Sequence, residues 1–180
     1  PKHLSDALIH EGVITGKLEH PGIVPVHSLA LDQAGRPVVV MKRIEGVEWG
    51  ELLKHPEHAA WSDWLGEVTA ENRAEEILMR VSEAVHFAHS RGIIHRDLKP
   101  ENVMLGRFRE VYLVDWGIAL QIEPGQATLG LAGTPACMAP EMVRGGPVDS
   151  RTDVYLLGAT LHHVLVGSYR HAGESISDVL

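Results

Sequence analysis

Hydrophobic residues recur at helical spacing in two parts of the first half of the chain. Between residues 5 and 18 they lie three or four positions apart, which predicts a helix with Ser5 or Asp6 as its N-cap. The most regular pattern runs over residues 70–90, and Gly92 directly after it is a typical helix end. We therefore expect one short and one long helix here.

A further helix is predicted over residues 151–166. Ser150 with Asp153 three positions later fits a capping box at its start. Because this segment is apolar on nearly all sides, we expect the helix to lie buried in the centre of the fold.

Short apolar runs predict two β-hairpins. Residues 23–31 and 38–41 flank a turn that contains Gly35. Residues 103–105 and 111–114 form the second pair of runs.

Two other stretches have no regular pattern. We expect loop and short helices over residues 45–66, and an irregular, Gly- and Pro-rich segment over residues 115–147.

Composition narrows the class of protein. The 180 residues are 44% hydrophobic and 22% charged, which is typical of one globular domain, or of one domain and part of another. The formal charge of −8 and the pI near 5.8 argue against a broad basic surface, so we expect no nucleic-acid partner.

The number of cysteines and the length of the apolar runs indicate the cellular compartment. Cys137 has no second cysteine with which to form an intramolecular disulfide, which suits a reducing compartment and favours the cytoplasm. The longest apolar candidate, residues 154–166, is interrupted by His162 and His163. It is shorter than the roughly 18 residues of a membrane span, and the N-terminus lacks the apolar core of a signal peptide, so we expect no membrane segment.

The residues with the most suggestive chemistry lie between the long helix and the second hairpin. Residues 95–102 read His-Arg-Asp-Leu-Lys-Pro-Glu-Asn, and Asp115 follows the next strand. Oxygen ligands from Asn102 and an aspartate suit Mg²⁺ that is shared with substrate phosphates. A separate carboxylate, Asp97, could orient a hydroxyl and accept its proton, while Lys99 would face a transferring phosphoryl group. This is the inventory that phosphoryl transfer needs.

These segments resemble the protein kinase family and occur in the family's order. The motifs are residues 95–102, Asp115-Trp116-Gly117, Gly133-Thr134-Pro135-Ala136 running into Ala139-Pro140-Glu141, and Asp153-Val154-Tyr155 followed by Leu157-Gly158. Upstream, Glu11 and Leu18-Glu19-His20-Pro21 resemble a helix and strand of the small kinase lobe, and residues 40–46 resemble its last strand and the hinge. The sequence looks most like bacterial serine/threonine kinases, and the resemblance covers nearly the whole chain.

The resemblance implies a two-lobed, kinase-like α+β fold that is truncated at both ends. Residues 1–45 would be a small, β-rich remnant of the N-lobe, with one helix, two strands and the hinge. Residues 46–180 would be a partial, mainly helical C-lobe with the catalytic loop and the activation segment. ATP would sit between these two parts of one partial kinase domain.

The resemblance also implies roles for single residues. Asp97 would orient and deprotonate the acceptor hydroxyl, and Lys99 would neutralise the γ-phosphate. Asn102 and Asp115 would bind Mg²⁺. Glu11 would pair with the lysine of the family's third strand.

Further residues would surround the adenine or regulate the site. Met41 resembles the gatekeeper, Met104 the floor of the adenine pocket, and the hinge is Lys42, Arg43 and Ile44. Separately, Arg96 would pair with a phosphate on the activation segment, for which Thr128 is the main candidate, and His95 would be a packing residue rather than a general base. Asp153, besides its place as a helix-cap acceptor, would anchor the backbone of the catalytic loop.

Two functions follow from the resemblance. The first is a serine/threonine protein kinase that transfers the γ-phosphate of ATP to Ser and Thr hydroxyls of protein substrates, with ATP and Mg²⁺ as cofactors. The alternative is a non-catalytic, pseudokinase-like interaction module or kinase fragment. It is motivated by the absence from this sequence of a Gly-x-Gly-x-x-Gly loop and of a lysine in the family's Val-Ala-Ile-Lys context.

Overall fold

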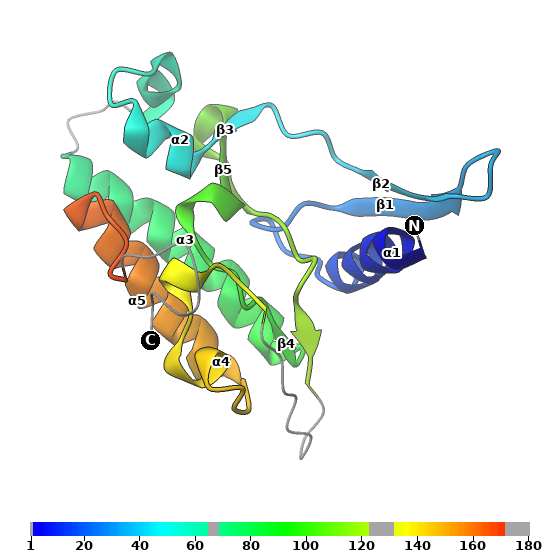
Figure 1. Ribbon diagram of the computed structural model, residues 1–180. Helices are drawn as coiled ribbons and strands as arrows, with labels where there is room; N and C mark the ends of the chain where they lie inside the picture. The colour runs from blue at the N-terminus through cyan, green and yellow to red at the C-terminus, as the bar shows by residue number, and fades with distance from the viewer. Residues whose placement is uncertain (1, 65–68, 123–131, 172–180) are drawn as a thin grey trace.

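The computed structural model describes residues 2–64, 69–122 and 132–171, and combines helices with short strands (Figure 1). The described α-helices are α1 (Lys2–Gly16), α2 (Trp49–Lys54), α3 (Ala70–Ser90), α4 (Pro140–Val143) and α5 (Ser150–Val166). The described strands are β1 (Val26–Leu31), β2 (Pro37–Met41), β3 (Gly46–Glu48), β4 (Ile93–Ile94), β5 (Val103–Gly106), β6 (Val111–Leu113) and β7 (Leu120–Gln121). This mixture confirms the predicted α+β class.

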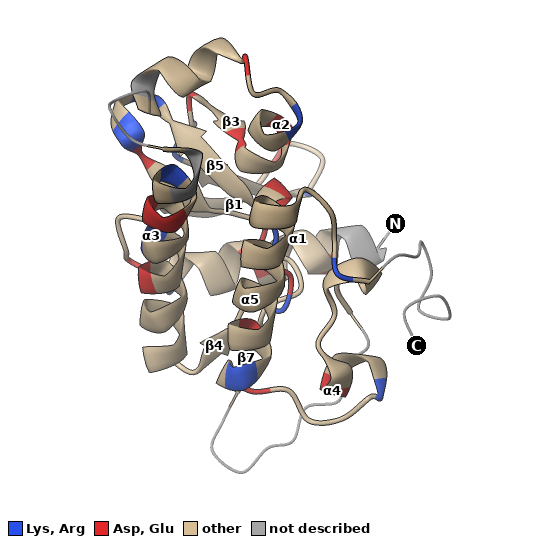
Figure 2. Cartoon of the chain, turned by 90° about the vertical axis from the view of Figure 1, so that its left-hand side faces the viewer, with Lys and Arg blue, Asp and Glu red and all other residues tan. Residues whose placement is uncertain are grey.

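Helix α1 and the β1–β2 hairpin pack together and project from one side of the molecule (Figure 1). On the other side α3 and α5 lie next to each other (Figures 1 and 2). Between these parts, β3, β5 and β6 form an antiparallel sheet in that order, and β4 pairs with β7. The division into residues 1–45 and 46–180 stays a prediction, with residue 45 in the connection between β2 and β3.

The first hairpin forms as its turn residues predict. The carboxylate of Asp32 accepts hydrogen bonds from the backbone N–H groups of Ala34 (2.8 Å) and Arg36 (2.9 Å). Gly35 has φ +74°, a backbone conformation that glycine adopts without steric cost. In the middle of β2 the hairpin packs so closely on α1 that a Cβ on Gly12 would lie 2.8 Å from Cγ2 of Val39.

Helix α3 supplies the main apolar face of the core. Its predicted bounds are confirmed, and the Thr69 hydroxyl accepts a hydrogen bond from Asn72 N at 3.3 Å as N-cap. Ile77 and Ala84 are fully buried on the face predicted to be apolar. Across the core they join Leu156 of α5 in one hydrophobic cluster. None of the described helices is long and apolar enough to cross a lipid bilayer.

The predictions for the start of α5 and for its burial are wrong. The N-cap is Asp149, which forms a capping box with Thr152, so Ser150 is the first helical residue. Val154 (62% exposed) and Leu165 (57% exposed) face away from the core. Among the described elements only one side of α5 is covered, chiefly by α3, which leaves the other side of an apolar helix open.

Other elements differ from the sequence-based expectation. Ser5 and Asp6 lie inside α1, which begins at Lys2, so neither is its N-cap. Strands β3, β4 and β7 were not predicted, because two or three residues are too few to show a period of two. In β3 a Cβ on Gly46 would lie 2.5 Å from the carbonyl oxygen of Leu105, so the strands approach closely only because this residue is glycine.

Candidate active site

The candidate active site is built on the loop between β4 and β5, and a buried aspartate holds this loop. Asp153, in the first turn of α5, is fully buried. Its Oδ2 accepts a hydrogen bond from His95 N and its Oδ1 one from Arg96 N, both at 2.9 Å, and Oδ2 also lies 2.7 Å from Nε2 of His89. Arg96 has φ +71°, a strained conformation for a residue with a side chain. The Asp153 contacts therefore hold the loop in a shape that its own residues disfavour.

Asp97 lies next in this loop, and both of its carboxylate oxygens are hydrogen-bonded. Oδ2 accepts from Lys99 Nζ at 2.8 Å and from Asn102 Nδ2 at 3.0 Å. Oδ1 accepts from the backbone N–H and the hydroxyl of Thr134 at 3.0 and 2.8 Å. Burial acts to raise the pKa of Asp97, but the hydrogen bonds from Lys99, Thr134 and Asn102 together lower it below its ordinary value. Asp97 is therefore ionised at neutral pH.

Thr134 is a member of this cluster that the sequence analysis used only as a family marker. Besides its two bonds to Asp97, its hydroxyl oxygen lies 2.6 Å from Nζ of Lys99, which donates to it. The side chains of Asp97, Lys99 and Thr134 thus form one closed hydrogen-bonded group. The available signal was a hydroxyl in the Gly133-Thr134-Pro135 sequence, but nothing in its spacing indicated which carboxylate it would meet.

The two predicted metal ligands are brought to neighbouring strand ends. Val103 pairs with Leu113, and Val114 N donates to the carbonyl of Asn102 at 2.9 Å, so Asn102 and Asp115 lie at the same end of β5 and β6. The amide nitrogen of Asn102 donates to Asp97, which leaves its Oδ1 as an acceptor. The exposed carboxylate of Asp115 accepts only a long bond from Gly117 N, at 3.4 Å, among the described residues. Such an all-oxygen donor set fits Mg²⁺.

Glu11 faces this end of the site from α1. Burial raises its pKa, and the nearby negative charge of Asp115 raises it further. Within the described part of the chain Glu11 forms no ion pair. Two carboxylates that face each other in this way create a position of negative potential suited to a cation.

We expect Glu11→Gln to stabilise the chain at neutral pH. A carboxyl with a raised pKa contributes its stability below its ordinary pKa of 4.5 and loses it as the pH rises through the folded-state value. The amide removes this loss, so the Tm at pH 7.5 should rise by about 1–2 °C and the difference should vanish near pH 4. Thermal unfolding followed by circular dichroism measures this. An equal Tm shift at both pH values would contradict it, and exposed Glu75→Gln is the control.

The predicted hinge runs between β2 and β3. The backbone N–H of Lys42 donates to the carbonyl of Pro25 at 3.0 Å, whereas the backbone groups of Arg43 and Ile44 form no hydrogen bonds with described residues. The latter two are therefore available to a ligand. Met41 ends β2 and is 41% exposed, and Met104 lies half-buried on β5 opposite Glu48 of β3.

The side chain of Lys42 binds Glu110 and Tyr112. Its Nζ donates to Oε1 of Glu110 at 3.1 Å and to the hydroxyl of Tyr112, and it lies 4.7 Å from the centre of the Tyr112 ring. The hydrogen bonds to Tyr112 and Glu110 raise the pKa of Lys42. Lys42 thus ties the hinge to β6.

Arg96 and His95, which precede Asp97, bind other parts of the fold. The guanidinium of Arg96 donates from Nε to the carbonyl of Ile118 at 2.7 Å, while Thr128, its predicted phosphate-bearing partner, lies outside the described residues. His95 is almost completely buried, accepts a hydrogen bond at Nδ1 from Asp97 N at 3.2 Å and packs edge-on against Trp116. Burial lowers the pKa of His95, which keeps the ring neutral.

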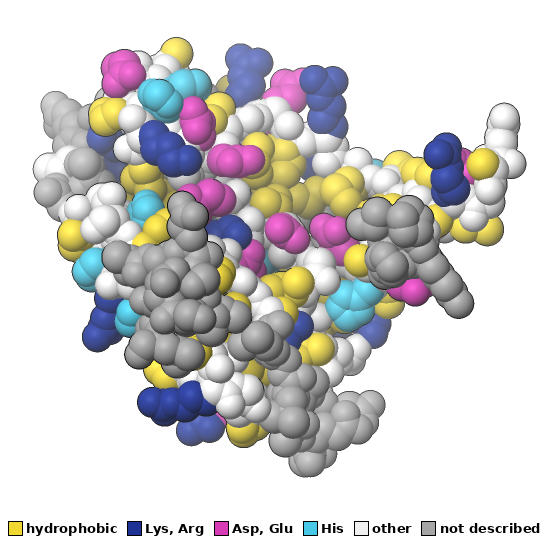
Figure 3. Space-filling model, in the orientation of Figure 1, with side chains coloured by type: hydrophobic (Ala, Val, Ile, Leu, Met, Phe, Trp, Pro, Cys, Tyr) yellow, Lys and Arg dark blue, Asp and Glu magenta, His cyan; other side chains and the backbone are white. Residues whose placement is uncertain are grey.

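Acidic side chains gather on the face shown in Figure 3, between the projecting hairpin and the helical part. Tyr169, which follows α5, donates its hydroxyl hydrogen to Oε2 of Glu101 at 2.6 Å, so the carboxylate two residues after Lys99 is already engaged.

Comparison with known proteins gives one consistent result. Residues 2–178 match the family model described as Protein kinase domain. The chain is 36% identical over 95% of its length to Serine/threonine-protein kinase PknD of Chlamydia felis, and 35% identical over 97% of its length to the protein of the same name from Chlamydia caviae. It is 34% identical over 95% of its length to the one from Chlamydia abortus. The matched segment covers 20–21% of these relatives, so the chain spans about a fifth of their length.

Proposed function

Since this chain belongs to the protein kinase family, we propose that it is a serine/threonine protein kinase, which transfers the γ-phosphate of ATP to Ser and Thr hydroxyls of protein substrates. The arrangement around Asp97 carries this proposal. A buried, ionised carboxylate that lies 2.8 Å from the ammonium group of Lys99 is suited to orient a hydroxyl beside a phosphoryl group. The relatives named as serine/threonine kinases support these acceptors.

Asp97, Lys99 and Thr134 would have different roles in the transfer. Asp97 orients the acceptor hydroxyl and takes its proton as the new P–O bond forms and the bond from the γ-phosphorus to the bridging oxygen of ADP breaks. Lys99 lies between Asp97 and Thr134 and neutralises negative charge on the transferred group. Thr134 is a positioning residue, because it acts only through these two side chains.

The oxygen donors of Asn102 and Asp115 would hold Mg²⁺, which neutralises phosphate charge when bound. The free backbone groups of Arg43 and Ile44 would meet the adenine, with Met41 and Met104 beside it. Glu11 would face a cationic group. ATP would then lie between residues 1–45 and residues 46–180, which we propose as the two parts of one kinase domain.

We further propose that protein substrates and ATP, rather than nucleic acids, are the partners. The net charge of −8 opposes binding to a polyanion. A cytoplasmic location is proposed from the single buried cysteine, Cys137, which suits a reducing compartment.

The test is transfer of labelled phosphate from ATP to a Ser- and Thr-rich peptide in the presence and absence of Mg²⁺. We expect Mg²⁺-dependent labelling of Ser and Thr and none of Tyr. No transfer by the folded protein would contradict the proposal and favour the second candidate, a non-catalytic interaction module. That candidate is supported by Glu11, which has no basic partner within the described residues and faces a second carboxylate.

We expect Thr134→Val to lower kcat/KM about five- to ten-fold, because it removes one hydrogen bond to Asp97 and one from Lys99. Thr134→Ser keeps the hydroxyl and should restore most of the activity. The backbone bond from residue 134 to Asp97 persists in both variants, so the two should fold alike. Equal kcat/KM values for the Val and Ser variants would show that the hydroxyl has no positioning role.

A further inference from the structure

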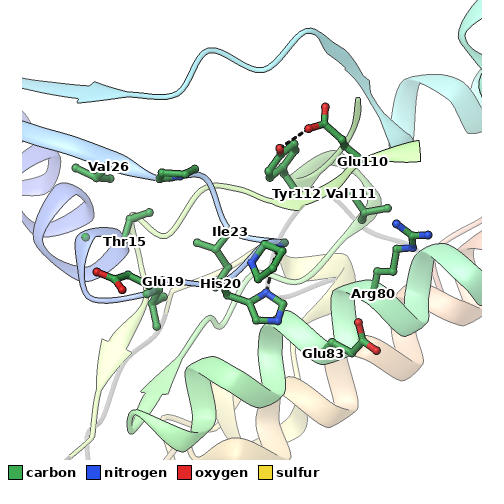
Figure 4. A pocket seen from close by; sticks show the side chains of 15 residues that line it. Thr15, Glu19, His20, Ile23, Val26, Arg80, Glu83, Glu110, Val111 and Tyr112 are labelled. Carbon is green, nitrogen blue, oxygen red and sulfur yellow. Dashed lines mark hydrogen bonds between the residues drawn. The ribbon is translucent and has the colours of Figure 1, made fainter. Parts of the chain in front are cut away.

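A groove of about 890 Å³ opens between three elements outside the candidate active site (Figure 4). Its walls are residues 15–26, which follow from the end of α1 into β1, together with the middle of α3 and strand β6. It therefore touches both the part of the chain that carries α1 and the part that carries α3.

The groove is preformed by a stiff segment. Gly22 N donates to Nδ1 of His20 at 3.0 Å, and Leu113 N donates to the carbonyl of Gly22 at 2.8 Å, which fastens the segment to β6. Pro21 and Pro25 further restrict its backbone. A ligand that binds here meets a surface that needs little ordering, which favours affinity.

The groove combines an apolar lining with uncompensated negative charge. Ile23, Val26 and Val111 contribute apolar side chains. The carboxylates of Glu19 and Glu83 have neither a hydrogen bond nor an ion pair within the described parts of the chain. These two acids lie on opposite sides of the groove in Figure 4.

The other charged residues on the walls, Arg80 and Glu110, already have partners in the fold. Arg80 donates to Glu76 and to the carbonyl of Arg109, both at 2.9 Å. Glu110 accepts hydrogen bonds from Lys42 and from Tyr112. Glu76 also binds Arg109, so it does not balance Arg80 alone, but the three acids that line the groove, Glu19, Glu83 and Glu110, outnumber its single arginine.

We infer that this groove docks an extended, basic segment of a partner protein. Aliphatic side chains of the segment would cover the apolar lining, and Arg or Lys side chains at its two ends would reach Glu19 and Glu83. An open groove with acids on opposite sides suits an extended peptide better than a compact ligand, because alternate side chains of a strand-like peptide can meet separate subsites. Since Glu110 and Tyr112 also hold Lys42, the docked segment would contact the wall that anchors the hinge.

The test uses fluorescein-labelled hexapeptides with Arg at both ends and mixed aliphatic residues between them, and a second set with Glu at both ends. Fluorescence anisotropy should show saturable binding of the Arg-ended set only, and the affinity should fall as the salt concentration rises. Glu19→Lys and Glu83→Lys should each weaken binding about five-fold. Glu75→Lys, the same charge change on an exposed position of α3 outside the groove, is the matched control.

Absence of saturable binding by the Arg-ended set, equal binding by the Glu-ended set, or an affinity unchanged by both groove variants would each overturn the inference. Circular dichroism verifies that the variants fold, which is expected because both acids are exposed. Asp97→Asn should leave peptide binding unchanged. The docking inference and the proposed kinase activity can therefore fail independently.

Discussion

Replacing Asp97 with Asn is expected to lower the rate of phosphate transfer about 10²- to 10⁴-fold. The substitution removes the negative charge and the proton acceptor. It also places an amide N–H₂ group against donors, because Asp97 accepts from Lys99 and Asn102 on one side and from Thr134 on the other. One of these donors then faces another donor in a buried site, which should lower the free energy of unfolding by about 1–3 kcal/mol.

The measurements are labelled-phosphate transfer and urea unfolding. Asp32→Asn is the matched control, because it makes the same chemical change in the β1–β2 turn, where an amide oxygen can still accept the turn hydrogen bonds. Its activity should be unchanged. Transfer retained by Asp97→Asn would remove the proposed role of this carboxylate.

Comparison of the wild type with Asp97→Asn also gives a pH-dependent difference in stability. Because the folded-state pKa of Asp97 lies below its ordinary value of 3.8, its charged form stabilises the fold above that value, and this contribution is lost as the pH falls through the folded-state pKa. The stability difference between the wild type and Asp97→Asn should therefore be constant from pH 5 to pH 7 and shrink below about pH 4. Urea unfolding across this range follows it.

Replacing Asp153 with Ala is expected to lower the free energy of unfolding by about 3–5 kcal/mol. The variant leaves the backbone N–H groups of His95 and Arg96 without an acceptor and removes the partner of His89. Arg96 would also lose the contact that holds it at φ +71°.

The matched control for this change lies at the same end of the same helix. Asp149 is the N-cap of α5 but is half-exposed, so Asp149→Ala should cost only about 0.5–2 kcal/mol. Urea unfolding of both variants compares the free energy lost with the helix cap, Asp149, with that lost with the buried anchor, Asp153. Equal losses would mean that the hydrogen bonds to the catalytic loop add nothing to stability.

Sequence patterns predicted the elements whose signals are local. The long apolar face of α3 and the Asp32-to-Gly35 turn are properties of residues within a few positions of each other. The same is true of residues 95–102, where Asp97, Lys99 and Asn102 are close in the chain and also meet in space. For that reason the centre of the site was predictable from the sequence.

Contacts between distant segments leave no signal in the local pattern of hydrophobic and polar residues. Thr134 meets Asp97 across 37 positions and Asp153 meets Arg96 across 57, and no periodicity reports such pairs. Asp153 was predicted as a helix cap from its place near the start of α5 and, by resemblance, as an anchor for the backbone of residues 95–102. The cap is Asp149 instead, and the anchoring is confirmed by the bonds from His95 N and Arg96 N.

The sequence by itself therefore determined the principal helices and hairpins, and through its family resemblance it predicted the α+β class and the candidate site residues. Tertiary structure decided which of these side chains meet. It set the hydrogen bonds of Asp97, the repulsive approach of Glu11 to Asp115 and the acidic groove beside β6. The physical reason is that helix and turn preferences depend on neighbouring residues, whereas burial and the pairing of charges depend on how distant segments pack.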